Sequence, residues 1–354
     1  MTTTASNLQA AASLPRWFTP AALVTAFSLA MASFTLTGFT NADGAPNLVA
    51  VAIVGFALFM VGTYLISRSV EGRRKATDRM VTGWVTAAFA MAVIPLVSLT
   101  WTVVEKGLNR LDAEFFTQSM RNVVGEGGGA LHAIVGTLEL TGIATLISVP
   151  LGIMTAIYLV EYGRGRLAKS VTFFVDVMTG IPSIVAGLFA FSLFLILLGP
   201  ASAINGFAGA ISLAVLMTPV VIRATEEMLK IVPNELREAS YALGVPKWLT
   251  IVKVVIPTAL AGIATGVIIA IARIIGETAP LLLAAGFTTS MNYNPFEEKM
   301  MTLPVFVYTS YAIQGTDVQS YVDRAWAGAL TLMIIVMVLN LVARIISKLF
   351  SPKG

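Results

Sequence analysis

The sequence predicts an all-α fold, a polytopic bundle of membrane-spanning helices. Hydrophobic residues make up 56% of the 354 residues and charged residues 12%, whereas a soluble domain has about 45–50% and about 25%. Such a chain has too few charges to coat a soluble surface, which argues against a cytosolic enzyme, a disordered protein and a secreted scaffold. The chain has no Cys and one His, His132, so disulfides, thiolate sites and His-based metal clusters are excluded.

Long charge-free runs locate the helices, because about 20 apolar residues cross roughly 30 Å of hydrocarbon. One run, Val177–Ile222, is too long for one crossing. It contains the turn signals Gly199-Pro200 and Asn205-Gly206, which divide it into two spans. The resulting eight spans derive from the runs Trp17–Ala42, Gly44–Ser67, Met80–Val104, Leu140–Val160 (extended back to Leu131), Val177–Ile222, Val254–Ala272 (continuing to about Phe287) and Ala325–Ala343.

Basic residues are distributed unevenly between the loops. With a cytoplasmic N-terminus, inner segments hold 17 of the 23 Lys and Arg residues, outer segments hold 5, and Arg273 lies inside a span. This follows the positive-inside rule and predicts a multi-pass protein of the cytoplasmic membrane with both termini inside. The segment Met300–Thr316 is short and contains Pro304, and a ninth span there would place the basic C-terminus outside. We therefore expect an outer interfacial helix.

The spans divide into two parts. Residues 1–80 are expected to form a transmembrane hairpin closed by a basic cytoplasmic linker, and residues 81–347 to form six core spans. A signal peptide is an alternative for the first run, but that run is longer than a typical h-region and a second span follows at once. A retained hairpin is therefore favoured.

The cytoplasmic loop between spans six and seven contains a short amphipathic helix. Asn234 is a plausible N-cap and Gly244 a plausible C′ residue, with Pro246 as a stop. Leu236, Ala239, Ser240 and Leu243 recur at i, i+3, i+4 and i+7 and form one small, apolar stripe. The stripe packs either on its own membrane domain or in a groove of a separate cytoplasmic protein.

The spacing within this loop resembles the EAA loop of ABC importer permeases, which spans residues 223–257 here. The family pattern is E-A-A, three residues, G, nine residues, I-x-L-P. Glu238, Ala239, Gly244 and Pro257 match it, while Ser240 stands in place of the second Ala. The resemblance implies a type I importer permease fold. It also implies a coupling helix in which Glu235, Glu238, Ala239, Ser240, Gly244 and Pro257 transmit ATP-driven closure.

The chain itself lacks a nucleotide-binding loop. The nearest match to a Walker A loop begins at Gly163 and has Ala168 where the second Gly is required, with no preceding strand. We therefore expect no enzymatic activity, catalytic residue, metal site or cofactor on this chain. ATP and Mg are expected on a partner.

Two charges within span seven indicate an anion site. A charge inside a span costs about 2.5–3.5 kcal/mol on insertion scales and usually faces the bundle interior. Arg273 and Glu277 stand at i and i+4, so on one helix they share a face. They form either an internal ion pair or a site in which the guanidinium binds an oxyanion. Thr278 adjoins this pair, and Arg223 at the inner mouth of span six is a second candidate station or an ordinary interfacial anchor.

Three strings narrow the resemblance. They begin at Gly180, Pro219 and Arg273, cover spans five to seven, and resemble the PstA family of phosphate permease subunits. More diffuse similarity extends from about residue 131 to 344. The resemblance implies import of inorganic phosphate together with a PstC-like permease, a PstB-like ATPase dimer and a PstS-like extracytoplasmic phosphate-binding protein. No nucleic-acid partner is expected.

Four further features of the sequence concern polar or helix-breaking residues within or near the spans. Glu139, in span four, is expected to make a satisfied interior hydrogen bond, and His132 to lie at the interface. Asp176 should reach the inner interface. Gly180, Pro182 and Ser183 break span five, either as a packing kink or as a lining of the substrate path.

Other functions compete with the phosphate permease. Within the same class, the substrate is another oxyanion such as sulfate, molybdate or phosphonate, because an Arg would serve any of them. In a different class, the chain is a secondary anion carrier, which would need no cytoplasmic coupling helix. A membrane enzyme would need a catalytic cluster near one interface, and the sequence shows none.

Overall fold

The computed structural model describes residues 13–37, 46–315 and 317–350, and these residues form helices and loops without a β-strand. The chain divides into two compact units, Met1–Thr100 and Trp101–Gly354. The division falls inside a helix, further along the chain than the predicted boundary at residue 80. Each unit is described by itself.

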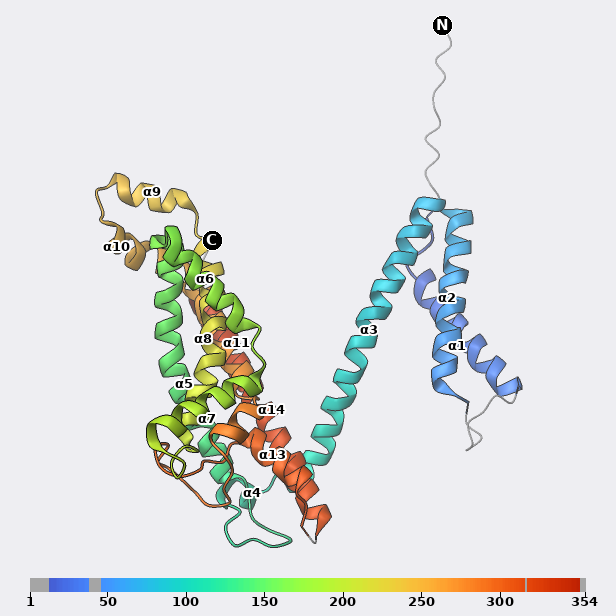
Figure 1. The fold of residues 1–354 in the computed structure, drawn as a ribbon. Coiled ribbons are helices and arrows are strands. Elements are labelled where there is room, and N and C mark those ends of the chain that lie inside the picture. Colours follow the sequence, from blue (N-terminus) through green and yellow to red (C-terminus); the bar gives the residue numbers. More distant parts are fainter. Residues whose placement is uncertain (1–12, 38–45, 316, 351–354) are drawn as a thin grey trace. The chain divides into compact units, whose positions relative to one another are not determined.

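The first unit contains α1 (Phe18–Thr37), α2 (Leu48–Val70) and the first part of α3 (Arg73–Gly107). Asn47 caps α2, because its side chain accepts hydrogen bonds from the backbone N–H groups of Val49 and Ala50. A tight turn at Glu71 reverses the chain between α2 and α3 (Figure 1). Ala42, where the first predicted run ends, and Gly44, where the second begins, lie outside the described residues.

The second unit holds the remaining helices. In chain order they are η1 (Leu108–Arg110), α4 (Ala113–Thr117), α5 (Leu131–Ile157), η2 (Tyr158–Tyr162), α6 (Gly165–Thr179), α7 (Ser183–Leu198), α8 (Gly206–Ile231), α9 (Asn234–Ala242), α10 (Lys247–Thr250), η3 (Ile251–Val255), α11 (Ile256–Ile274), α12 (Ala279–Ala284), α13 (Leu303–Ala312) and α14 (Val318–Phe350). The elements η2 and η3 are single π turns.

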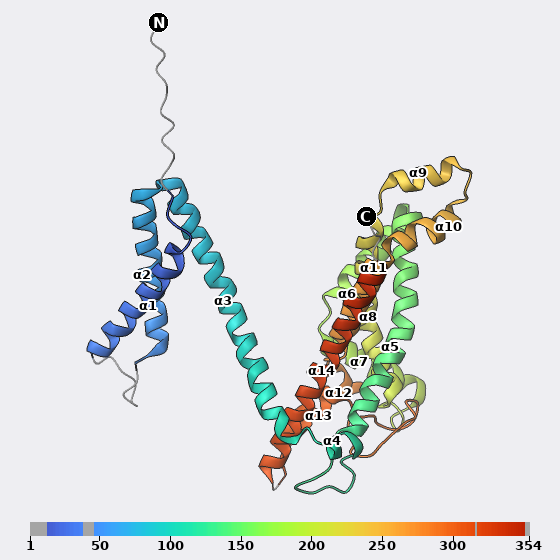
Figure 2. The same ribbon diagram turned by 180° about the vertical axis from the view of Figure 1, so that it is seen from behind.

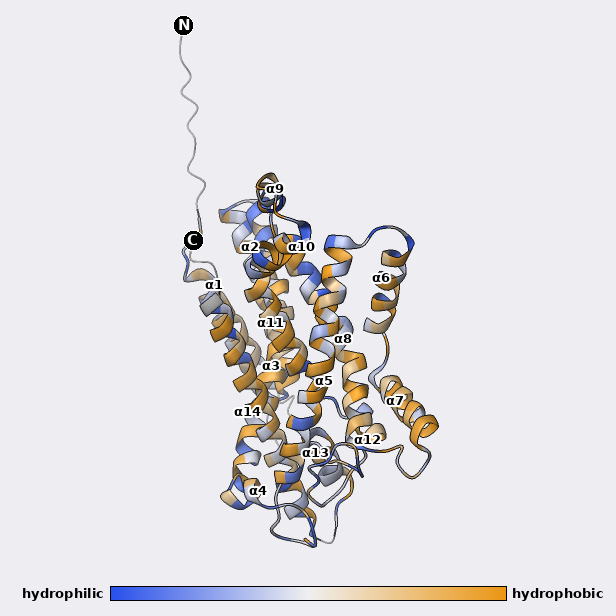
Figure 3. Cartoon of the chain, turned by 90° about the vertical axis from the view of Figure 1, so that its left-hand side faces the viewer, coloured by the Kyte–Doolittle hydropathy of each residue, from blue (hydrophilic) through white to orange (hydrophobic). Residues whose placement is uncertain are grey.

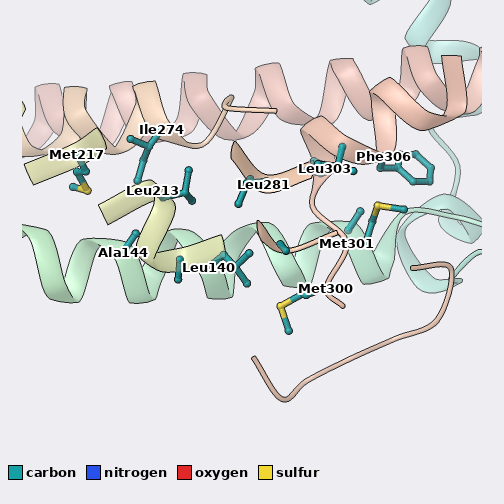
Figure 4. Close-up of a cluster of buried hydrophobic side chains, with 14 of the residues drawn as sticks. Leu140, Ala144, Leu213, Met217, Ile274, Leu281, Met300, Met301, Leu303 and Phe306 are labelled. Carbon is teal, nitrogen blue, oxygen red and sulfur yellow. The ribbon is translucent and has the colours of Figure 1, made fainter. Parts of the chain in front are cut away.

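Helices α5 and α8 form the centre of the second unit. Leu140 and Ala144 of α5 lie beside Leu213 and Met217 of α8 in the buried cluster (Figure 4). Small residues allow the close approach: a Cβ added at Gly152 would lie 2.6 Å from a side-chain atom of Val221. In lipid no hydrophobic effect draws helices together, so close packing of this kind drives their association.

Seven described helices are long and apolar enough to cross a membrane, and a bent pair brings the count to eight. The hydrophobic colouring of α7 and α14 is visible in Figure 3. The bent pair is α6 and α7, which meet at 109°. The fifth span is therefore broken where Gly180, Pro182 and Ser183 predicted a break.

Three local expectations were wrong. The predicted span to Phe287 ends at Ile274, because Gly276 and Pro280 both disfavour a continuing helix. The segment Met300–Thr316, expected to be an outer interfacial helix, contains α13. Phe306 on this helix is 1% exposed and belongs to the core. His132 is likewise buried, with its ring edge-on to Phe306 at 5.7 Å between centroids.

Candidate coupling loop and substrate path

The loop after α8 forms the expected short helix. Figures 1 and 2 both place α9 at one end of the second unit, beside α10. The helix α9 begins one residue earlier than predicted, since Asn234, the expected N-cap, is the first helical residue and Pro233 is the cap. Pro233 provides no side-chain cap, but it also lacks one of the N–H groups that are left unpaired at the start of a helix.

The C-terminus of α9 is a Schellman motif. Gly244 has a φ of +76°, its N–H donates to the Tyr241 carbonyl, and the Val245 N–H donates to the Ser240 carbonyl. These are the two bonds that define the motif, and glycine enters the left-handed region without a steric penalty. Gly244 thus sets the direction in which the chain leaves α9, as the sequence predicted.

The two faces of α9 differ in burial. Ser240 is 8% exposed and its hydroxyl bonds that of Thr250 on α10 at 2.8 Å. The other stripe residues Leu236, Ala239 and Leu243 are exposed, as are Glu235 and Glu238. Packing on the chain's own membrane domain therefore accounts for Ser240 alone among the stripe residues. The remainder is an apolar surface flanked by carboxylates.

Arg237 fastens α9 to two membrane helices. Its Nη2 atom donates to Glu161 Oε1 at 2.8 Å and to the Leu229 carbonyl at 3.0 Å, and its Nη1 atom donates to the Val232 carbonyl at 2.6 Å. Glu161 lies in η2 at the end of α5, while Leu229 and Val232 lie at the end of α8. One side chain thus joins α9 to α5 and α8.

Lys247 reinforces this junction. Its ammonium donates to the backbone carbonyl of Glu161 and lies 4.9 Å from the ring centroid of Tyr162. The guanidinium of Arg237 and the Glu161 carboxylate are 13% and 5% exposed. Sequence reasoning counted Arg237 and Lys247 only as positive-inside residues. Their partners lie 76 and 86 residues away, and no local pattern indicates such pairs.

Arg273 and Glu277 do not share a helix face. Arg273 stands in the last turn of α11, and Glu277 lies in the break before α12. Within the described parts of the chain no ion pair joins them, and no side-chain hydrogen bond to either is found. Arg273 is exposed, whereas Glu277 and Thr278 are half-buried. The prediction that both residues share one helix face was wrong. The internal ion pair, one of the two alternatives, is not formed.

Arg223 is engaged by carboxylates. It donates to Asp176 on α6 and to Glu226 Oε2 at 2.6 Å, and the other oxygen of Glu226 accepts from Lys230 at 2.7 Å. Two cations and two anions therefore form one network at the end of α8. Asp176, expected to reach the interface, is tied to Arg223 although its side chain is 59% exposed.

The helices that follow two helix breaks pack together in the second unit. The first, at Gly180–Pro182, separates α6 from α7, which begins at Ser183. The second lies between α11 and α12. Gly187 of α7 packs directly on the backbone of Pro280 in α12, where an added Cβ would lie 2.6 Å from the Pro280 Cα. The structure thus brings together the interrupted segments of spans five and seven.

Glu139 does not make its expected hydrogen bond. Its Oε2 atom is buried without a partner in the described structure. Among the described residues no group of three or more His, Cys, Asp or Glu side chains is arranged to hold a metal ion.

Comparisons with known proteins place this architecture in a family. Residues 148–353 match the family model described as binding-protein-dependent transport system inner membrane component. The chain is 46% identical over 285 residues to phosphate transport system permease protein PstA 1 of Mycobacterium tuberculosis (strain CDC 1551 / Oshkosh), covering 80% of this chain and 92% of that protein. It is 38% identical to PstA of Haemophilus influenzae, covering 77% and 94%.

A solved structure supports the fold. A chain of a bacterial alginate ABC transporter is 16% identical, with a TM-score of 0.52, and the match covers 78% of this chain and 98% of that one. Together with the sequence relatives, this confirms the resemblance seen in the coupling loop and in spans five to seven. The chain belongs to the PstA family of binding-protein-dependent inner membrane permease proteins.

Proposed function

We propose that this chain is the permease subunit of an ATP-driven importer of inorganic phosphate that works by alternating access. The observation that carries the proposal is the exposed face of α9, held on the ends of α5 and α8 by Arg237. A helix fixed in this way would pass a displacement to both membrane helices. The names of the sequence relatives support phosphate as the substrate.

The ATPase subunits would dock on α9. Leu236, Ala239 and Leu243 offer apolar contact, and Glu235 and Glu238 offer charges at its edge. Ser240 would act indirectly, since its hydroxyl is used by Thr250. Gly244 would set the exit angle of the loop, and Pro257, near the start of α11, would receive the movement. ATP and Mg would bind the PstB-like partner, and this chain would carry no cofactor.

Arg273 is the proposed contact for the anion. Arg273 is exposed and its guanidinium has no intramolecular partner among the described residues, so its planar fork of donors is available to two oxygens of a phosphate. Glu277 and Thr278 follow at the adjacent break, and the breaks at Gly180, Pro182 and Ser183 would line the path. A PstC-like second permease would complete it. Arg223, already paired with Asp176 and Glu226, would contact an anion only after exchanging partners.

The remaining features of the proposal concern topology and delivery. Residues 1–80 would form a separate membrane hairpin and residues 81–347 the permease domain, with both termini in the cytoplasm. A PstS-like protein would deliver phosphate from outside. These assignments rest on the distribution of basic residues and on the family.

Purification of the intact complex tests the function. We expect an ATPase and a second permease to copurify with this chain, and we expect phosphate-loaded binding protein to stimulate ATP hydrolysis. Phosphate transport by the chain reconstituted alone, without ATP, would instead identify a secondary carrier. Stimulation by sulfate-loaded but not phosphate-loaded binding protein would overturn the substrate assignment.

A further inference from the structure

The first unit contains a large cavity that the proposed transport cycle does not use. Its volume is about 860 Å³, within the roughly 300–1,000 Å³ typical of small-molecule sites. It lies between α1, α2 and α3. The walls are mainly apolar and include the aromatic side chains of Phe27, Phe56 and Phe59.

Charges line only one end of this cavity. They are Glu71, Lys75, Asp78 and Arg79, beside the basic linker that the positive-inside rule assigns to the cytoplasmic leaflet. From Thr82 to Ile94 the α3 wall is otherwise uncharged and rises about 18 Å at 1.5 Å per residue. One leaflet supplies about half of the roughly 30 Å hydrocarbon thickness. The cavity thus has the polarity and depth of a lipid in the inner leaflet.

The charges at the mouth are not equally available. Both oxygens of Glu71 are occupied, because they accept from Arg79 at 2.7 and 3.0 Å, from Ser67 at 2.8 Å and from the Leu14 N–H at 2.8 Å. Lys75 and Asp78 are exposed and form no ion pair among the described residues. One cation and one anion are therefore left to face a ligand, which favours a zwitterion.

An unsatisfied hydroxyl adds an independent observation. Thr63 lines the cavity and is 5% exposed, yet its Oγ1 atom is buried without a hydrogen-bond partner. Gly83 packs against Met60 across the antiparallel pair α2 and α3, so Thr63 lies close to the level of Arg79. A buried hydroxyl normally finds a partner, and a carbonyl oxygen of a lipid ester just below a head group would satisfy it.

We propose that this cavity binds one zwitterionic phospholipid of the cytoplasmic leaflet. The phosphate contacts Lys75, the head-group amine contacts Asp78, an ester carbonyl accepts from Thr63, and one acyl chain lies along the aromatic wall. An acidic phospholipid would match Lys75 but would place a second negative charge beside Asp78. The lipid would hold the three helices of the first unit together.

Native mass spectrometry of the purified transporter tests the site. The intact complex is incorporated into nanodiscs of equal parts phosphatidylethanolamine and phosphatidylglycerol, and released lipid-bound species are compared. We expect one retained phosphatidylethanolamine in the wild type and its loss in Ala87→Trp, which places an indole ring inside the cavity. Ala88→Trp is the matched control, because Ala88 is the next residue, is exposed and does not line the cavity.

Two milder variants keep the test independent of folding. Thr63→Val should weaken retention without changing side-chain size, and Asp78→Asn should abolish the preference for phosphatidylethanolamine over phosphatidylglycerol. Equal retention in Ala87→Trp and Ala88→Trp would overturn the proposal. So would a complex that retains no lipid at this site, the result expected if a helix of another subunit occupies the cavity.

Discussion

Replacing Arg237 by Met should disconnect α9 from the membrane helices. The change removes the bonds from the guanidinium to Glu161, Leu229 and Val232 and leaves the Glu161 carboxylate, 5% exposed, without its cation. Removing one partner of a buried ion pair costs about 3–5 kcal/mol. Because α9 is attached locally, we expect this cost to appear mainly as detachment of the loop, with the membrane bundle intact.

The assay is ATP hydrolysis by the reconstituted transporter, with phosphate uptake measured in parallel. Arg237→Met should retain assembly but lose stimulation of hydrolysis by loaded binding protein. Lys230→Met is the matched control: its side chain is 60% exposed in its pair with Glu226, and such surface pairs contribute about 0–1 kcal/mol.

A double-mutant cycle isolates the Arg237 contact. Glu161→Gln combined with Arg237→Met removes both charges, so the double variant should be less impaired than the sum of the single ones. We expect a coupling of about 0.5–3 kcal/mol in the free energy of local opening of α9, measured by hydrogen exchange. Wild-type stimulation in Arg237→Met, or strict additivity in the cycle, would refute the proposed junction.

Three further predictions concern single side chains. Gly244→Val forces a β-branched residue to a φ of +76°, at about 1–2 kcal/mol or more; uncoupled ATPase activity in an inserted complex is expected, and normal uptake would contradict the Schellman role. Arg273→Met should abolish phosphate uptake while leaving assembly unchanged, and wild-type uptake would exclude it as the anion contact. The hydrogen bonds from Arg79 lower the pKa of Glu71 from 4.5 to about 2. Its stabilising contribution is therefore full above about pH 4.5 and is lost as the pH falls towards 2. An acid melt of Glu71→Gln should lack this dependence, and identical acid melts in wild type and variant would contradict it.

The sequence predicted those features that depend on local pattern. Hydropathy located the spans, and the glycine and proline after α9 located its end, because both signals act within a few residues. The continuation of span seven past Ile274 was wrong because an apolar composition fits a long helix as well as a broken one. The burial of α13 was also missed, because a short apolar segment has the same composition whether it lies at an interface or in a core.

The contacts that distinguish the coupling site were not predictable in this way. Arg237 and Glu161 are 76 residues apart, and each alone resembles an ordinary inner-face charge. Only the packing of α5 beside α8 brings them together. The same holds for Gly187 and Pro280, whose contact joins α7 to α12, two helices that the sequence places in separate spans.

The π turn η3 has a consequence for the rotational phase of α11. It stands between the coupling loop and α11, and a π turn closes its hydrogen bond one residue later than an α turn. Each residue of an α-helix rotates the side chains by about 100°. The azimuth of Arg273, at the far end of α11, is therefore set by the π turn at Ile251–Val255. Deleting one residue there would turn that guanidinium by more than a quarter of a revolution around the helix axis while leaving its helix nearly the same length.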